Sequence, residues 1–139
     1  MSNMYQDAIV PEWCNKYEIG IPELDFQHKF FLELIKRFHY RIKSGISMDL
    51  IKYHILEINL YAQFHFCSEE NLMMLHAYPD KGTHKNLHTE LLELLANKSN
   101  LFELGKISVD DISSFLVEWF VTHTINEDIK LAMFINRTN

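Results

Sequence analysis

Apolar residues recur every three or four positions along most of this chain, and this spacing is typical of amphipathic α-helices. Polar or turn-forming segments interrupt the spacing three times, which separates four helices that follow an N-terminal arm. We predict the arm over residues 1–21 and the helices over residues 22–43, 48–77, 82–97 and 108–130. Alternating β-branched runs are few, so nothing in the sequence competes with an all-α fold.

Capping and turn residues support these boundaries. Pro22 suits the first turn of a helix, and Pro79 ends the second helix, which is the longest. The third helix is expected to end in the polar stretch 97–100. Ser108, with Asp111 three residues later, resembles a capping box at the start of the fourth helix.

Short connections between long helices make neighbouring helices antiparallel. The predicted fold is therefore an up-down-up-down antiparallel four-helix bundle that forms one domain over residues 1–139. With 139 residues, of which 47% are hydrophobic, the chain is large enough for one compact core. One stripe of the first helix is expected to face that core: Leu24, His28, Phe31, Leu32 and Ile35.

Charge and composition exclude several classes of protein. The formal net charge is −6, and no run of basic residues is suited to a phosphate backbone, so nucleic-acid binding is not expected. The N-terminus lacks the features of a signal peptide, and no segment has the roughly 20 apolar residues of a membrane span. We therefore expect a soluble, cytoplasmic protein. Its two cysteines, Cys14 and Cys67, should be reduced, with Cys67 buried.

Side chains that bind metals recur on all four predicted helices. His84 and His88 stand four residues apart, so their imidazoles share one helix face, where a single metal ion can bind both. His65 and Glu69 repeat this spacing with one imidazole and one carboxylate. The first and fourth helices contribute three further candidates: His28, His123 and Asp128.

The spacing between His123 and Asp128 does not suit a regular helix. Five residues correspond to an angle of about 140° around an α-helix. Both side chains can point inward only if the helix widens between them, as in a π-bulge; otherwise only one of them has a role. The other three histidines are expected at the surface or at its boundary: His39, His54 and His76.

Taken singly, each candidate is more often a surface or core residue than a metal ligand. Together they would bring five imidazoles and two carboxylates to one depth in the bundle, and burying them without a metal would cost several kcal/mol. The set is too large for one tetrahedral zinc ion and too rich in nitrogen for calcium or magnesium. Two octahedral first-row ions with a solvent-derived bridge use all the donors and leave one position open, and iron suits this mixture.

Four segments of the sequence resemble the hemerythrins, and specifically the single-domain bacterial members called bacteriohemerythrins. The segments are WCNKYEIGIPELDFQH, HFCSEENLM, YPDKGTHKNLH and WFVTHTINED. The resemblance runs from Trp13 to Asp128, and all seven ligand positions are present with the family's spacings. Thr124 departs from the family pattern, in which isoleucine commonly follows the ligand histidine.

The resemblance implies a non-haem di-iron centre with an oxo or hydroxo bridge. Its ligands would be His84, His88 and His123 on one iron, His28 and His65 on the other, and Glu69 and Asp128 bridging both. The iron with two histidines would have the open position, where the family binds dioxygen. Aromatic residues that could wall this position are Phe31, Phe66, Trp119 and Phe120.

The implied function is reversible dioxygen binding for storage, delivery or scavenging, without catalysis. Two alternatives stay open: an oxygen or redox sensor module, and a di-iron oxidase or nitric-oxide-handling protein. The histidine majority disfavours the enzyme, because oxygen-activating di-iron bundles usually carry Glu-x-x-His pairs. Expected partners are dioxygen and a reductase or an oxygen-consuming protein. A monomer is expected, because no long apolar stripe should stay exposed on a closed bundle.

Overall fold

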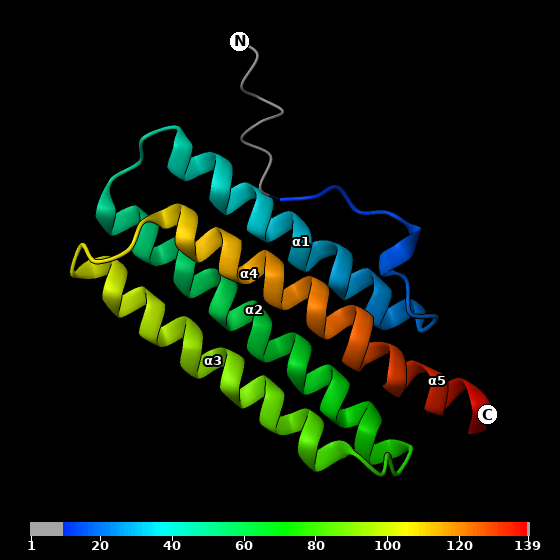
Figure 1. Cartoon of the computed structure of the whole chain (residues 1–139). Coiled ribbons are helices and arrows are strands. Elements are labelled where there is room, and N and C mark those ends of the chain that lie inside the picture. Colours follow the sequence, from blue (N-terminus) through cyan, green and yellow to red (C-terminus); the bar gives the residue numbers. More distant parts are fainter. Residues whose placement is uncertain (1–9, 139) are drawn as a thin grey trace.

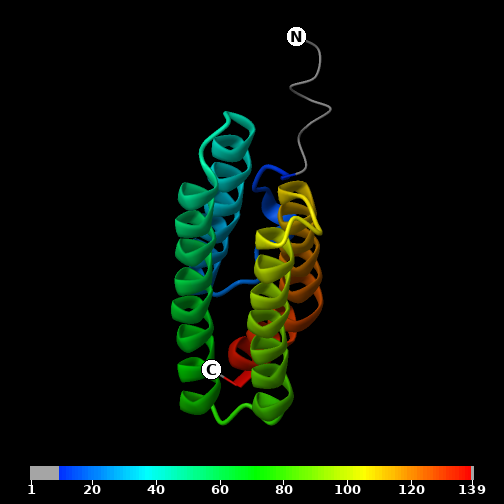
Figure 2. The same cartoon turned by 90° about the vertical axis from the view of Figure 1, so that its left-hand side faces the viewer.

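The computed structural model describes residues 10–138, which contain helices and no β-strand. Four long helices run alternately up and down (Figure 1): α1 (Pro22–Lys43), α2 (Met48–Leu75), α3 (Lys81–Glu103) and α4 (Val109–His123). Figure 2 shows α1 beside α2 on one side of the bundle and α3 beside α4 on the other. The predicted all-α four-helix bundle is confirmed.

The fourth predicted helix is longer than expected, because further helical segments continue it. A π-helical turn, η3 (Thr124–Asp128), follows α4 and leads into α5 (Ile129–Thr138), so the helix passes its predicted end at residue 130. It continues because Leu131 and Ile135 keep the apolar spacing and are buried.

The third helix also exceeds its prediction, since it continues through the polar stretch 97–100 to Glu103. Leu95 and Phe102 are buried on its inner face, so the stretch between them covers the solvent side of a helix and is not a loop. Gly105 follows with a φ of +72°, a conformation that glycine adopts without strain after a helix end.

The second helix ends at Leu75, two residues before its predicted end. Ala77 has a φ of 51°, which takes the chain out of the helix. The N–H of Tyr78 then donates to the carbonyl of Met73 at 2.8 Å and closes the helix end.

Two apolar clusters fill the bundle at different depths. The larger cluster includes Phe31, Phe66 and Phe120, whereas the smaller cluster includes Leu24 and Leu131. The predicted inward stripe of α1 is confirmed, because each of its five residues is at most 3% exposed. His28 stands in that stripe between the two clusters, so a polar layer separates them.

Two predictions about burial are wrong. His39 is buried, because it lies on the inner side of α1, where its Nδ1 is 3.4 Å from the hydroxyl of Ser113 on α4. Cys67 is exposed, because it lies on the outer side of α2 next to the buried Phe66. Apolar neighbours in the sequence did not indicate which way either side chain points.

The described part of the N-terminal arm, residues 10–21, packs against the bundle, and residues 1–9 of the predicted arm lie outside the described residues. A 3-10 turn, η2 (Asn15–Tyr17), buries Tyr17. The carboxylate of Asp25 on α1 then accepts hydrogen bonds from the N–H groups of Ile19 and Gly20, at 2.7 and 3.2 Å, and ties the arm to the start of α1. Among residues 10–138, none of the helices combines the length and the apolar character that a membrane crossing requires.

The predicted capping box at α4 is present. The Ser108 hydroxyl accepts from the N–H of Asp111 at 3.2 Å, and the Asp111 carboxylate accepts from the N–H of Ser108 at 2.8 Å. Replacing Ser108→Ala should lower the free energy of unfolding by about 1 kcal/mol, because one N–H at the helix start loses its partner. Urea denaturation followed by circular dichroism measures the change.

Ser114→Ala is the matched control, because Ser114 is exposed in the middle of α4, where alanine favours the helix. The capping interpretation is wrong if both variants unfold at the same urea concentration.

Candidate metal centre

The polar layer between the two apolar clusters is made of seven side chains from every part of the bundle. One of these side chains comes from α1, two come from α2 and two from α3. The last two come from the end of α4 and the end of η3. Each of the seven is at most 4% exposed: His28, His65, Glu69, His84, His88, His123 and Asp128. All seven residues singled out from the sequence therefore meet in one place.

The seven side chains form two overlapping groups, within each of which one potential ligand atom per residue lies within 4.8 Å of the others. The three-histidine group consists of Glu69, His84, His88, His123 and Asp128. The two-histidine group consists of His28, His65, Glu69 and Asp128. Both carboxylates belong to both groups.

Glu69 turns one oxygen toward each group. Its Oε1 lies 3.0 Å from Nε2 of His84 and 3.0 Å from Nε2 of His88. Its Oε2 lies 3.2 Å from Nε2 of His28 and 2.8 Å from Nε2 of His65. The carboxylate therefore spans the two groups.

Asp128 has the same arrangement from the opposite side of the bundle. Its Oδ1 lies 3.0 Å from Nε2 of His84 and 2.8 Å from Nε2 of His123, whereas its Oδ2 lies 2.9 Å from Nε2 of His28. The π-helical turn makes this possible, because its wider turn brings Asp128 back to the face of His123. The sequence left two possibilities open for this pair, and the structure shows the widened helix.

Hydrogen bonds on the outer side of the layer fix the orientation of two imidazoles. Nδ1 of His65 donates to the amide oxygen of Gln27 at 2.7 Å, and Nδ1 of His88 donates to the carboxylate of Glu70 at 2.9 Å. Both acceptors lack a hydrogen, so each Nδ1 carries the proton. In a neutral imidazole, Nε2 then presents its lone pair to the oxygens of Glu69.

Lone pairs of nitrogen and oxygen that face each other repel unless a cation lies between them. Burial alone would lower the pKa values of His28, His84 and His123, but contacts with the charged Asp128 and Glu69 outweigh burial and raise them to about 9, 10 and 9. Burial alone would raise the pKa values of Asp128 and Glu69, yet the imidazoles hold both well below their usual range. The layer therefore favours bound positive charge.

The spacing of the donors fits metal ions. Two ligands that bind one ion at right angles, each at about 2.1 Å, are about 3.0 Å apart. The nitrogen-to-oxygen distances around Glu69 Oε1 and Asp128 Oδ1 include four between 2.8 and 3.0 Å. Both oxygens of Asp128 also lack a partner with hydrogen-bond geometry among the described residues. These are acceptors that a cation would satisfy.

Comparison with known proteins identifies the family. The family model described as the Hemerythrin HHE cation binding domain matches residues 19–135. The chain belongs to the hemerythrin family. The matched range contains all seven residues of the polar layer, in agreement with the sequence resemblance to bacteriohemerythrins.

Individual relatives agree with this assignment. The bacteriohemerythrin of Clostridium acetobutylicum is 27% identical over 127 residues, which cover 84% of this chain and 94% of the relative. The bacteriohemerythrin of Methylococcus capsulatus is 30% identical over 100 residues, which cover 71% and 76%. A crystal structure of wild-type hemerythrin is 24% identical and superposes with a TM-score of 0.81 over 91% of this chain and 98% of that one, which shows the shared fold.

The four aromatic residues predicted near the open position divide between the two groups. The ring of Phe66 stacks on His88, with centroids 3.9 Å apart, and the ring of Trp119 stacks on His123 at 4.4 Å. Trp119 therefore lies over the three-histidine group of this hemerythrin-family site. Phe66 lies between the two groups, because its ring is also 5.9 Å from the ring of His65. The histidine that each of these rings covers depends on how α2 and α4 lie in the bundle. The spacing of residues along the sequence did not indicate that arrangement.

Phe31 and Phe120 lie on the two-histidine side. The ring of Phe31 is 6.3 Å from that of His65, and the ring of Phe120 is 5.9 Å from that of His28. Both side chains are 1% exposed, and their rings contact each other at 5.9 Å. They form the inner wall of this part of the bundle.

Two further aromatic residues support that wall, and the sequence did not single them out. Tyr17 of the arm packs on Phe120 at 5.9 Å, and Tyr61 of α2 packs on Phe31 at 5.7 Å. The hydroxyl of Tyr61 also donates to the carbonyl of Gln27 at 2.8 Å. No spacing rule connects Tyr17 to the histidines, because the arm reaches them only through the tertiary fold.

Replacing Gln27→Leu should weaken metal binding by roughly 10- to 100-fold, because the imidazole of His65 loses the acceptor that orients it. Competition with a chelator, followed by measurement of the metal that remains bound, detects the change. Gln63→Leu is the matched control, since Gln63 is exposed on α2 and bonds only to Asn59 among the described residues. Equal metal retention in both variants would show that Gln27 does not support the site.

Proposed function

We propose that this chain binds dioxygen reversibly at a pair of iron ions, and that it is not an enzyme. The proposed ligands are the seven residues of the polar layer, with Glu69 and Asp128 bridging the two ions. The observation that carries this proposal is the division of each carboxylate between a three-histidine group and a two-histidine group. A bound iron pair, with an oxo or hydroxo bridge, would supply one reversible electron per ion.

The difference between the two groups supports a binding role. The three-histidine group offers five protein ligands and the two-histidine group offers four. Because first-row ions of this type favour six positions, the two-histidine side is where a small molecule has room to bind. The histidine majority, and pairs four residues apart in place of Glu-x-x-His motifs, favour binding over oxidation of a substrate.

Apolar packing around the two-histidine side supports reversibility. Phe31 and Phe120 are 1% exposed, and Leu24, one turn before His28 on α1, is fully buried. These side chains keep bulk water from His28 and His65. A dry site hinders the entry of protons and the departure of a charged ligand, both of which would make binding irreversible.

The outer hydrogen bonds differ in charge between the two groups. His88 donates to the Glu70 carboxylate, whereas His65 donates to the neutral amide of Gln27. A carboxylate partner makes an imidazole a stronger electron donor than an amide partner does. We infer that Glu70 strengthens the three-histidine position, while the position with room for dioxygen keeps a weaker donor in His65.

The proposed function also implies a physiological partner and a cellular location. Iron must be ferrous to bind dioxygen, so we propose that a reductase, or an oxygen-consuming protein coupled to one, is a physiological partner. Cys14 and Cys67 are both free and exposed, which suits a reducing compartment. This favours the cytoplasm as the location. An oxygen sensor would use the same site, but it would also need a partner whose binding follows oxygenation.

Cycling the reduced protein between oxygen and nitrogen tests the proposed function. We expect about two iron ions per chain and an absorption change in the visible range that appears with oxygen and reverses under nitrogen. Glu69→Gln should lose at least half of the iron, because a neutral amide cannot bridge two cations as a carboxylate does. His54→Gln is the control, since His54 lies on α2 outside the polar layer and contacts Arg41.

Either of two results would refute oxygen carriage. Immediate oxidation that nitrogen does not reverse would point to a redox sensor or an oxidase, and steady oxygen consumption with a reductant would point to an enzyme. Equal iron content in Glu69→Gln and His54→Gln would refute Glu69 as a bridging ligand.

Phe31→Leu tests the dry wall. The smaller side chain leaves space beside His65, so irreversible oxidation of the oxygenated protein should become several-fold faster. Phe38→Leu is the matched control, because Phe38 is also 1% exposed on α1 but lies about two turns farther from His28. The two variants should lose similar stability, so an equal oxidation rate in both would mean that Phe31 does not protect the site.

A further inference from the structure

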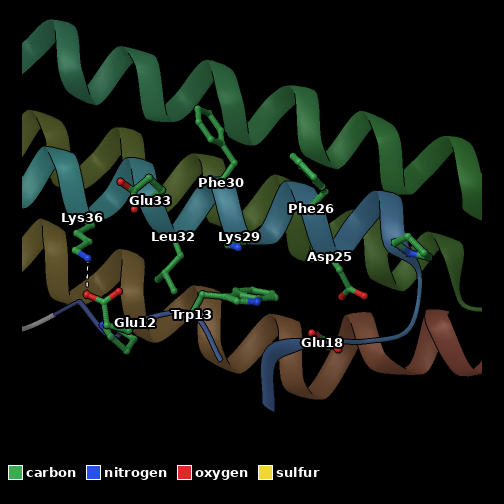
Figure 3. A pocket seen from close by; sticks show the side chains of 12 residues that line it. Glu12, Trp13, Glu18, Asp25, Phe26, Lys29, Phe30, Leu32, Glu33 and Lys36 are labelled. Carbon is green, nitrogen blue, oxygen red and sulfur yellow. Dashed lines mark hydrogen bonds and ion pairs between the residues drawn. The ribbon is translucent and has the colours of Figure 1, made fainter. Parts of the chain in front are cut away.

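Apolar side chains that have no role at the metal centre cover the outer surface of α1 and α2. Figure 3 shows Phe26 and Phe30 projecting from α1 on the side of α2. Four residues of α2 point outward at helical spacing, because the buried residues Ile58 and Ala62 occupy the opposite side of that helix. The α1–α2 apolar face consists of Phe26, Phe30, Tyr53, Leu56, Leu60 and Phe64.

The α1–α2 apolar face is continuous across the two helices. The half-buried ring of Tyr61 lies 5.2 Å from the ring of Phe30 and 6.0 Å from that of Phe64, so it joins the aromatic residues of α1 to those of α2. The face then follows α2 from Phe64 back to Tyr53, over eleven residues and about 17 Å of helix. The exposed Glu57 lies on the same side of α2, so the face is a mainly apolar surface that contains one carboxylate.

The size of this face exceeds what a monomer normally exposes. Its six residues are between 40% and 80% exposed. With roughly 200 Å² for each fully exposed side chain, they present about 700 Å². The largest apolar patch of a typical monomer is about 300–600 Å². A stable interface buries about 800 Å² on each partner. The apolar residues alone therefore come close to the area that a dimer needs.

A groove borders the α1–α2 apolar face and shares two of its residues. This groove of about 530 Å³ lies between the arm and α1, and its lining includes Trp13 together with Phe26 and Phe30 (Figure 3). Lys29 and Glu33 border the same groove, so both signs of charge are present at the edge of the face. A surface with both signs can complement a copy of itself, whereas the net charge of −6 disfavours an anionic membrane.

We propose that a second copy of this chain covers the α1–α2 apolar face in a two-fold symmetric dimer. Two-fold symmetry places the same patch of both copies in contact, so each apolar face meets an equal apolar face. The monomer predicted from the sequence rested on the premise that no long apolar stripe stays exposed. That premise is wrong, because four apolar residues of α2 form such a stripe.

The proposed interface lies over the helices that carry His28 and His65. Tyr61 connects the two regions, since its ring packs on Phe31 and its hydroxyl bonds to the carbonyl of Gln27. The second copy would add a layer between solvent and the two-histidine side of the centre.

Sedimentation velocity of the full-length protein, from low micromolar to several hundred micromolar, tests the proposal. The wild-type protein should sediment with the mass of two chains and dissociate on dilution. Leu60→Glu combined with Phe64→Glu should be monomeric throughout, because a dimer would bury four uncompensated carboxylates. Met133→Glu is the control, since Met133 is 52% exposed on α5, away from the face. Circular dichroism establishes that all three proteins keep the same helical content.

Several results would overturn the dimer. One is a wild-type protein that stays monomeric at every concentration. Another is a double variant that associates as the wild type does, or a Met133→Glu control that dissociates as readily as the double variant. A monomeric wild-type protein that instead co-sediments with vesicles of phosphatidylethanolamine and phosphatidylglycerol would assign the face to lipid.

Discussion

Two buried carboxylates govern the centre of this protein. Glu69 and Asp128 are fully buried, and each directs one oxygen to a three-histidine group and the other to a two-histidine group. Two negative charges in an apolar interior are costly unless positive charge accompanies them. The five imidazoles turn their Nε2 atoms to these oxygens, which makes the layer a site for cations. The hemerythrin-family bundle supports the proposed iron pair through this charge balance.

The apolar clusters on both sides of the layer strengthen the attraction of the two carboxylates for positive charge. Phe31 and Phe120 close the layer on the side of the larger cluster, and Leu24 and Leu131 close it on the side of the smaller one. Low polarity on both sides strengthens every interaction between charges and donors within the layer. The same packing excludes water, so the stability of the bundle and the chemistry of its centre depend on the same side chains.

Hydrogen bonds and ring contacts connect the centre to the surface of the bundle. Gln27 and Glu70 hold the outer nitrogens of His65 and His88, and Tyr61 links Gln27 to the aromatic side chains of α1. Thr124, the departure from the family pattern, is 1% exposed beside His123, at the start of the π-helical turn. The centre, its supporting hydrogen bonds and the α1–α2 apolar face are therefore successive layers of one structure.

The sequence by itself determined the bundle and the seven polar residues of its centre. Helical periodicity is local, so residues four apart, such as His84 and His88, must share a face. The five-residue spacing of His123 and Asp128 left two possibilities open, a wider turn or a role for only one of them. Tertiary structure alone decided that the rings of Phe66 and Trp119 stack on histidines of the three-histidine group and that His39 is buried. It also left the outer side of α2 apolar and exposed. Spacing fixes the face of a helix, but only the packing of other helices decides what that face meets.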